Sequence, residues 1–151
     1  MILTDRSTIL LPAEKVWPFL VTPAHFVTWS HNLVSVDARE PFTLGRPFSA
    51  VFKWNDKPIQ FLVTPTIVEP NRRLELRFDN AVGEDVRPDL RMVESIELQE
   101  LFGRTVVTKR LALTHHGIAW YWVVVMTLIT ALGHRVGPDR LKDLCEGRPV
   151  S

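Results

Sequence analysis

Alternation of apolar and polar residues dominates the middle of the chain and predicts a series of antiparallel strands. Alternate residues of a strand share one face. In the segment 74–78, Leu74, Leu76 and Phe78 fall on one face, whereas Glu75 and Arg77 fall on the other. One apolar and one charged face are typical of an antiparallel sheet that covers a core on one side only. Similar patterns predict six or seven strands, over residues 4–10, 33–37, 48–54, 59–67, 72–79, 92–101 and 105–114.

The turn at Pro70-Asn71 predicts the register of one hairpin. If Glu69 pairs with Arg72, Val63 lies opposite Phe78 and the apolar residues of both strands share a face. Pro65 lies inside the first of these strands, and proline cannot donate a ladder hydrogen bond. We therefore expect an irregularity at Pro65.

The turn at Phe102-Gly103 predicts the register of the last hairpin. If Leu101 pairs with Arg104, Glu94 and Lys109 lie on the apolar face of the two strands. In this register the two charged residues are diagonal neighbours, close enough for long side chains to meet. A register shifted by one residue would instead place both of them outside.

Helices are predicted near both ends of the chain. A short helix begins at Pro12 and is limited or kinked by Pro18, and a second follows Thr22-Pro23 and ends near Trp29. A long helix is predicted from Ile118 to about Cys145, and Gly137-Pro138 is expected to kink or restart it. Its first half is apolar nearly all round, and such a helix needs a concave partner, which a strongly curved sheet supplies. The predicted fold class is α+β.

The uncharged run from Leu111 to His134 raises the question of a membrane span. Its helical part, Ile118–Gly133, has 16 residues. At ~1.5 Å per residue it would cover about 24 Å, less than the ~30 Å of a bilayer core. We therefore expect a buried helix and no stable membrane span. The N-terminus has no cationic stretch followed by a long apolar run, which indicates no secretory signal.

Composition narrows the classes of function. The 151 residues carry 46% hydrophobic and 23% charged residues, a mix typical of a single globular domain. A net charge of +1 argues against nucleic-acid binding. Cys145 is the single cysteine, so the sequence predicts neither a disulfide framework nor a cysteine zinc site, and it favours the cytoplasm. The five histidines have no metal-ligand spacing, so we expect no metal. No glycine-rich loop suits a phosphate, and we expect no cofactor.

The order of elements and several local motifs resemble the START-like, or SRPBCC, helix-grip superfamily. The motifs that carry the resemblance are the opening helix and turn at 12–23, the aromatic pair within 26–29, the hairpin Val68-Glu69-Pro70-Asn71-Arg72-Arg73-Leu74, the turn and strand at 103–108, and the closing segment 117–146. The closing segment is similar to that of bacterial members of the polyketide cyclase/dehydrase-like type. Many relatives, however, carry arginines where this chain has Val123 to Thr130.

The resemblance implies a deep apolar cavity between sheet and closing helix that holds a lipid, quinone, steroid or polyketide-like molecule. It implies no fixed set of catalytic residues. Three hypotheses stay open: a hydrophobic-ligand-binding protein, a polyketide cyclase or dehydratase, and an interaction module or homodimer that uses the apolar helix.

Glu94 and Lys109 are the candidate polar groups of this cavity. They could orient a carbonyl or hydroxyl of a ligand, or act as general acid and base, because burial and a nearby opposite charge change pKa values. Alternatively, they form an ion pair at a wet rim. His31 is the histidine expected at the cavity mouth. The remaining residues expected to line the cavity are Trp29, Phe48, Phe52, Trp54, Phe61, Val63, Leu76, Phe78, Ile96, Leu111, Trp120, Tyr121 and Val124.

Overall fold

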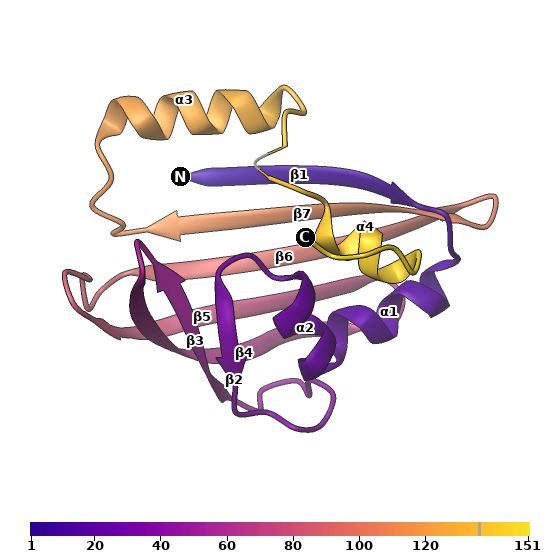
Figure 1. Cartoon of the computed structure of the whole chain (residues 1–151), viewed down its shortest axis with the longest axis horizontal. Helices are drawn as coiled ribbons and strands as arrows, with labels where there is room; N and C mark the ends of the chain where they lie inside the picture. The colour runs from indigo at the N-terminus through magenta and orange to yellow at the C-terminus, as the bar shows by residue number, and fades with distance from the viewer. Residues whose placement is uncertain (136) are drawn as a thin grey trace.

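Seven antiparallel strands form one curved sheet in the computed structural model, which describes residues 1–135 and 137–151. The strand order is β1-β7-β6-β5-β4-β3-β2 (Figure 1). The strands are β1 (Ile2–Ile9), β2 (Leu33–Val36), β3 (Phe48–Trp54), β4 (Lys57–Glu69), β5 (Arg73–Gly83), β6 (Arg91–Leu101) and β7 (Arg104–Thr114). The predicted α+β class and the curved antiparallel sheet are confirmed.

The predicted register of the last hairpin is confirmed. Leu101 pairs with Arg104, so Glu94 lies opposite Leu111 and Ile96 lies opposite Lys109. Phe102 and Gly103 both have positive φ, which is typical of a two-residue hairpin turn. Glu94 and Lys109 are therefore diagonal neighbours on one face of the sheet.

The predicted register of the β4–β5 hairpin is wrong by one residue next to its turn. Glu69 pairs with Arg73, because the loop contains three residues and Asn71 adopts a positive φ. A register shift between Pro65 and Ile67 then leaves Thr66 without an opposite residue and restores the expected pairing of Val63 with Phe78. The irregularity expected at Pro65 is thus confirmed, and it compensates for the longer turn.

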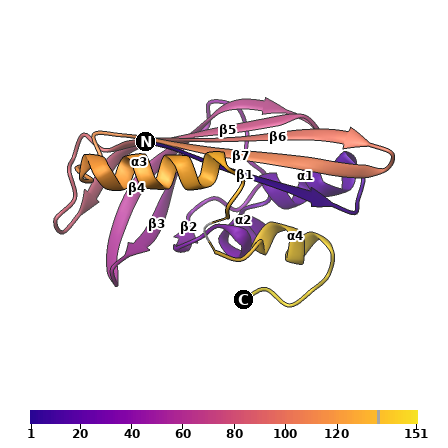
Figure 2. The same cartoon turned by 90° about the horizontal axis from the view of Figure 1, so that it is seen from above.

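Three short helices cover one face of the sheet (Figure 2). They are α1 (Ala13–Val21), α2 (Pro23–Trp29) and α4 (Arg140–Cys145). α1 continues through Pro18 to Val21 and is longer than predicted. Fully buried side chains of the helices and the sheet form the core, among them Val16, Leu20, Phe26, Leu74 and Leu141.

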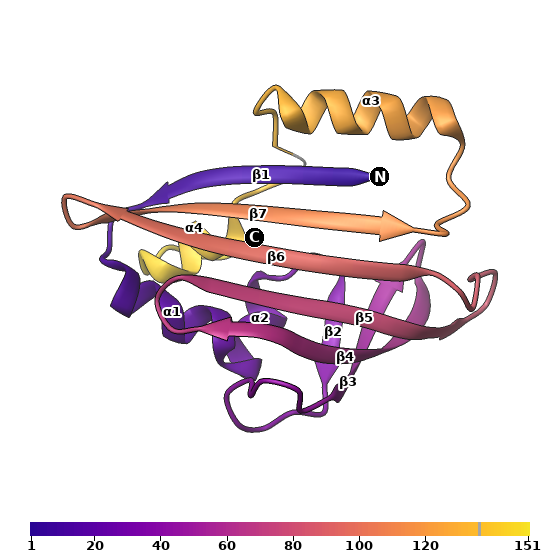
Figure 3. The same cartoon turned by 180° about the vertical axis from the view of Figure 1, so that it is seen from behind.

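On the opposite face of the sheet, the described residues form no helix (Figure 3). Charged side chains occupy this face. Arg73 pairs with Glu75 at 3.3 Å, and Arg77 pairs with Asp79 at 2.7 Å, in each case along one strand. This is the solvated face that the alternation of residues predicts.

The prediction of one long C-terminal helix packed on the concave face is wrong, but the restart expected at Gly137-Pro138 is observed, because α4 begins at Arg140. The segment forms two helices, α3 (Trp120–Ala131) and α4, separated by a connector in which Gly133 and Gly137 have positive φ. α3 lies beside β1, outside the edge of the sheet (Figures 1 and 2). Trp120, Tyr121 and Val124 are exposed there. Within the described part of the chain, no helix has the length and apolar character to cross a membrane.

Candidate functional site

A pocket of about 150 Å³ lies on the concave face, where β1, β6 and β7 approach the ends of α2 and α3. Four of the predicted site residues line it: His31, Glu94, Lys109 and Leu111. Leu3, Thr4, Asp5, Arg110, Thr130 and Arg135 complete the lining. The strand pairing explains this convergence, because Leu3 and Asp5 of β1 lie opposite Leu111 and Lys109 of β7.

Glu94 lines the pocket, and none of the residues that the structure describes forms a hydrogen bond with its carboxyl group. It lies on β6 between Leu76 of β5 and Leu111 of β7, both apolar. Burial raises the pKa of the Glu94 carboxyl, and the nearby ammonium of Lys109 opposes this rise. Among the described residues, no side-chain or backbone hydrogen bond lowers the pKa of Glu94. The carboxyl group of Glu94 can therefore donate a hydrogen bond to a molecule in the pocket when it is protonated, or accept one when it is ionised.

Lys109 forms its ion pair with Asp5, at 3.5 Å between Nζ and Oδ2. Its ammonium also lies 5.5 Å from the centre of the Trp29 ring, within the range of a cation–π contact. The Trp29 indole in turn donates a hydrogen bond to the Phe19 carbonyl at 2.8 Å. Lys109 is thus held by a carboxylate and an aromatic ring.

Arg135 connects the segment after α3 to β1 at the pocket. Its Nε donates to Asp5 Oδ1 at 2.8 Å, and its Nη2 donates to the Arg6 carbonyl at 3.0 Å. Its Nη1 lies 3.2 Å from Asp139 Oδ2. Sequence reasoning missed Asp5 and Arg135. The alternation of β1 could have placed Asp5 on the inner face, but no sequence signal indicates the approach of Arg135.

His31 lies in the turn after α2, and its side chain lines the pocket. Burial lowers the pKa of the His31 imidazole, and the charges of Arg140 and Lys109 lower it further. Gly137 of the connector comes so close that a Cβ there would lie 3.3 Å from His31 Cε1. His31 and the connector therefore border the pocket together.

Several predicted site residues are packed in the core. Phe61, Val63, Leu76, Phe78 and Ile96 are all buried, none of them more than 3% exposed. Phe52, Phe61 and Phe78 contact one another edge to face, with ring centres 5.7–6.0 Å apart. These side chains therefore belong to the hydrophobic core and do not line the concave pocket.

Other predicted site residues lie away from the pocket. Trp54 is 60% exposed at the end of β3, and Trp120, Tyr121 and Val124 are exposed on α3. Phe48 lines a second, larger pocket, which the sequence did not indicate.

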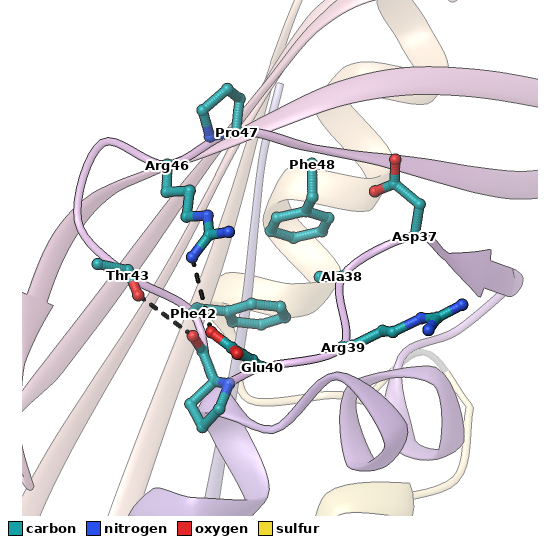
Figure 4. Close-up of a pocket in the computed structure, with 10 residues that line it drawn as sticks. Asp37, Ala38, Arg39, Glu40, Phe42, Thr43, Arg46, Pro47 and Phe48 are labelled. Atoms are coloured by element: carbon teal, nitrogen blue, oxygen red, sulfur yellow. Dashed lines mark hydrogen bonds and ion pairs between the residues drawn. The ribbon is translucent and has the colours of Figure 1, made fainter.

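The second pocket has a volume of about 380 Å³ and is enclosed by the loop between β2 and β3 (Figure 4). Phe42 and Phe48 stack within it with ring centres 4.7 Å apart. Glu40 and Arg46 form an ion pair of 3.6 Å across it, and both side chains are largely exposed. Exposed ion pairs contribute little free energy, whereas the carboxyl of Glu94 in the concave pocket is half-buried and flanked by Leu76 and Leu111. The concave pocket is therefore the better candidate site.

A metal site is not indicated by the described residues, since none of their His, Cys, Asp and Glu side chains gather in groups of three or more that could hold an ion. Cys145 is buried on α4, and burial raises the pKa of its thiol to about 12. A thiol with this pKa is protonated at neutral pH and is a poor nucleophile.

Comparison with protein families identifies one matching family, described as "Activator of Hsp90 ATPase homolog 1-like protein", over residues 10–127. The match covers most of the chain, from the end of β1 into α3. A search among curated proteins found no match.

Solved structures with the same fold come from several organisms. Protein CV1439 from Chromobacterium violaceum is 14% identical, with a TM-score of 0.66 and 96% of each chain covered. Protein MLL2253 from Mesorhizobium loti is 18% identical, with a TM-score of 0.66, covering 99% of this chain and 100% of that one. DynU16, described as a protein of the dynemicin biosynthetic locus, is 19% identical with a TM-score of 0.63, covering 98% of this chain and 48% of that one. At these identities the likeness concerns the fold.

Proposed function

Because this chain belongs to the Activator of Hsp90 ATPase homolog 1-like family, within the START-like (SRPBCC) superfamily, we propose that it binds a hydrophobic small molecule whose polar end contacts Glu94. The fold of this family is commonly a ligand-binding fold. The observation that carries the proposal is a carboxyl group in a concave pocket, raised in pKa by burial and flanked by Leu76 and Leu111.

The size of the pocket limits what it holds. Pockets for drug-sized ligands usually measure about 300–1,000 Å³, whereas this one measures about 150 Å³. It accommodates one end of a ligand, and the apolar remainder extends out past His31 and the connector. A carbonyl or hydroxyl group is the polar end that suits it, because Glu94 can donate to the first when protonated and accept from the second when ionised.

A binding assay with Nile red, an apolar dye that carries a carbonyl, tests the proposal. Wild-type protein is titrated with the dye, and fatty acids, quinones and steroids are then added to displace it. Glu94→Leu removes both the donor and the acceptor and is expected to weaken binding about tenfold, in line with ~1–2 kcal/mol for a hydrogen bond to a carboxyl group. Glu97→Leu is the matched control, because Glu97 lies on the same strand, pairs with Arg73 and faces the solvated side. Equal affinities of the two variants would contradict a role for Glu94.

Catalysis by Glu94 is the second candidate function, favoured by the raised pKa of its carboxyl. A carboxyl group with a raised pKa can act as general acid near neutral pH, with Lys109 stabilising the charge that develops. DynU16, a structural neighbour, is described as a protein of a biosynthetic locus, which motivates this test. Turnover of a linear polyketide mimic that is lost in Glu94→Gln while dye binding persists would support an enzyme. If the wild type does not turn over the mimic, ligand binding without catalysis remains the proposed function.

A further inference from the structure

Helix α3 turns most of its large apolar side chains away from the sheet it lies beside. Thr130 is its one buried residue, and Thr127 is partly buried one turn earlier. Both lie on the stripe that also includes Val123 and Met126, spaced three and four residues apart as one helix face requires. The opposite side carries the large apolar residues. A surface helix of a soluble monomer usually turns such residues toward the core of its own chain.

The exposed side of α3 and its C-cap is large. Eight apolar residues make up this surface, which we call the α3 patch: Trp120, Tyr121, Trp122, Val124, Val125, Leu128, Ile129 and Leu132. Their exposed fractions run from 38% for Ile129 to 77% for Leu132. A whole aromatic side chain has a surface of about 150–250 Å². Multiplied by the exposed fractions, areas of this size give the patch an exposed apolar surface on the order of 1,000 Å². Monomers rarely leave more than about 300–600 Å² of contiguous apolar surface exposed, whereas each partner of a stable interface buries about 800 Å².

The chemistry of the α3 patch suits an identical surface. No charged residue occurs from Ile118 to Leu132, so two copies meet without repulsion between like charges. Tyr121, Val124, Val125, Leu128 and Leu132 form a continuous stripe of three- and four-residue spacings, which is the pattern that packs helix against helix. A twofold axis through such a stripe makes one surface complementary to itself.

A membrane surface fits these observations less well. Helices that lie in the plane of a bilayer carry a cationic polar face, and α3 carries no lysine or arginine. The nearest cation that follows it, Arg135, is bound by Asp5 and Asp139. The whole chain has a net charge of only +1, which provides little attraction to an anionic membrane.

We propose that the α3 patch is the interface of a twofold-symmetric homodimer, in which α3 of one chain packs against α3 of a second copy. In this dimer the second copy lies beyond β1 at the edge of the sheet, on the side away from α1 and α2 (Figures 1 and 2). The proposal is independent of the ligand, since none of the eight residues of the patch lines the concave pocket.

Light scattering across a range of protein concentrations tests the proposal. The wild type is expected to have twice the mass of the chain, and Leu128→Glu is expected to raise the dimer dissociation constant at least a hundredfold by burying an unpaired charge. Leu44→Glu is the matched control, because Leu44 is 62% exposed, like Leu128 at 57%, but lies in the loop of the second pocket. A wild type that is monomeric throughout, or a control that dissociates equally, would overturn the proposal.

A cross-linking experiment locates the interface without a disruptive charge. Val125→Cys places a thiol near the middle of the stripe and is expected to form a disulfide-linked dimer on mild oxidation. The wild type serves as control because its one cysteine, Cys145, is buried. Absence of the linked dimer at concentrations where the variant is dimeric by light scattering would contradict an α3–α3 contact. Binding of monomers to neutral phosphatidylcholine vesicles, lost in Leu128→Glu, would identify a membrane as the occupant instead.

Discussion

Helices α3 and α4 come from one stretch of sequence, yet they pack in opposite ways. α3 is the longer and more apolar of the two, and most of its large side chains face solvent. α4 has six residues, half of them charged, and buries Leu141 completely. Apolar content alone therefore does not decide which helix joins the core.

The contacts of α4 explain the difference. Asp139 caps its N-terminus by accepting from the Lys142 backbone N–H at 3.1 Å. Lys142 also pairs with Glu146 at 2.9 Å and donates to the Thr8 carbonyl of β1. Polar groups thus hold α4 in one position, and it packs its buried residues Leu141 and Cys145 where it contacts α1, α2 and β1. The N-cap residue of α3, Ala119, makes no side-chain cap hydrogen bond.

The largest effect is expected from truncating the buried leucine of α4. Leu141→Ala is expected to lower the free energy of unfolding by about 2–5 kcal/mol, the usual cost of a cavity in a core. Leu128→Ala on α3 is expected to cost less than about 1 kcal/mol when the protein is dilute enough to be monomeric. Urea denaturation measures both. Equal losses would mean that α3 is buried within its own chain in solution.

A smaller effect is expected at the glycine that joins the two helices. Gly137 has a φ of +91°, and a Cβ there would meet His31 at 3.3 Å. Gly137→Ala is expected to cost about 1–2 kcal/mol for the left-handed backbone, with an added cost from the crowded imidazole.

Gly147→Ala is the control for the backbone contribution, because its φ is +73° and nothing lies within 4 Å of the added Cβ. Thermal unfolding of both variants separates the two contributions. If Gly137→Ala were no more destabilising than Gly147→Ala, the contact between the connector and His31 would contribute nothing.

The smallest effect concerns the concave pocket beside the end of α3 and depends on pH. The pKa of Glu94 is raised above its ordinary value of 4.5, so the folded state holds this proton more tightly than the unfolded state. The associated stability is present below pH 4.5 and is lost as the pH rises through the raised pKa. Glu94→Gln removes this dependence, and we expect its advantage over the wild type to grow with pH to about 1 kcal/mol.

The other charged groups around Glu94 are the same in both proteins, so their titration cancels in the difference between wild type and variant. These groups are Asp5, His31, Lys109, Arg110 and Arg135. Unfolding in urea at several pH values between 4 and 8 measures the difference. A constant difference across this range would show that Glu94 is not desolvated.

The site was predictable from the sequence where it depends on strand alternation. The turn at Phe102-Gly103 sets the register of its hairpin, and this register places Glu94 and Lys109 on the inner face. The partner of Lys109 was not predictable, because Asp5 lies more than one hundred residues away in the sequence and pairs through β1. The same applies to Arg135, which reaches Asp5 from the connector.

The sequence by itself determined the strands, the tight turn at Phe102-Gly103, the early helices and the charged outer face of the sheet. These features depend on the preferences of neighbouring residues and on a two-residue period, which are local properties. Only the tertiary structure decided where the closing segment lies. The hydrophobic effect favours burial of α3 but is non-directional, so it does not specify which surface covers the helix. The position of α3 at the edge of the sheet depends on contacts between segments that are distant in the chain.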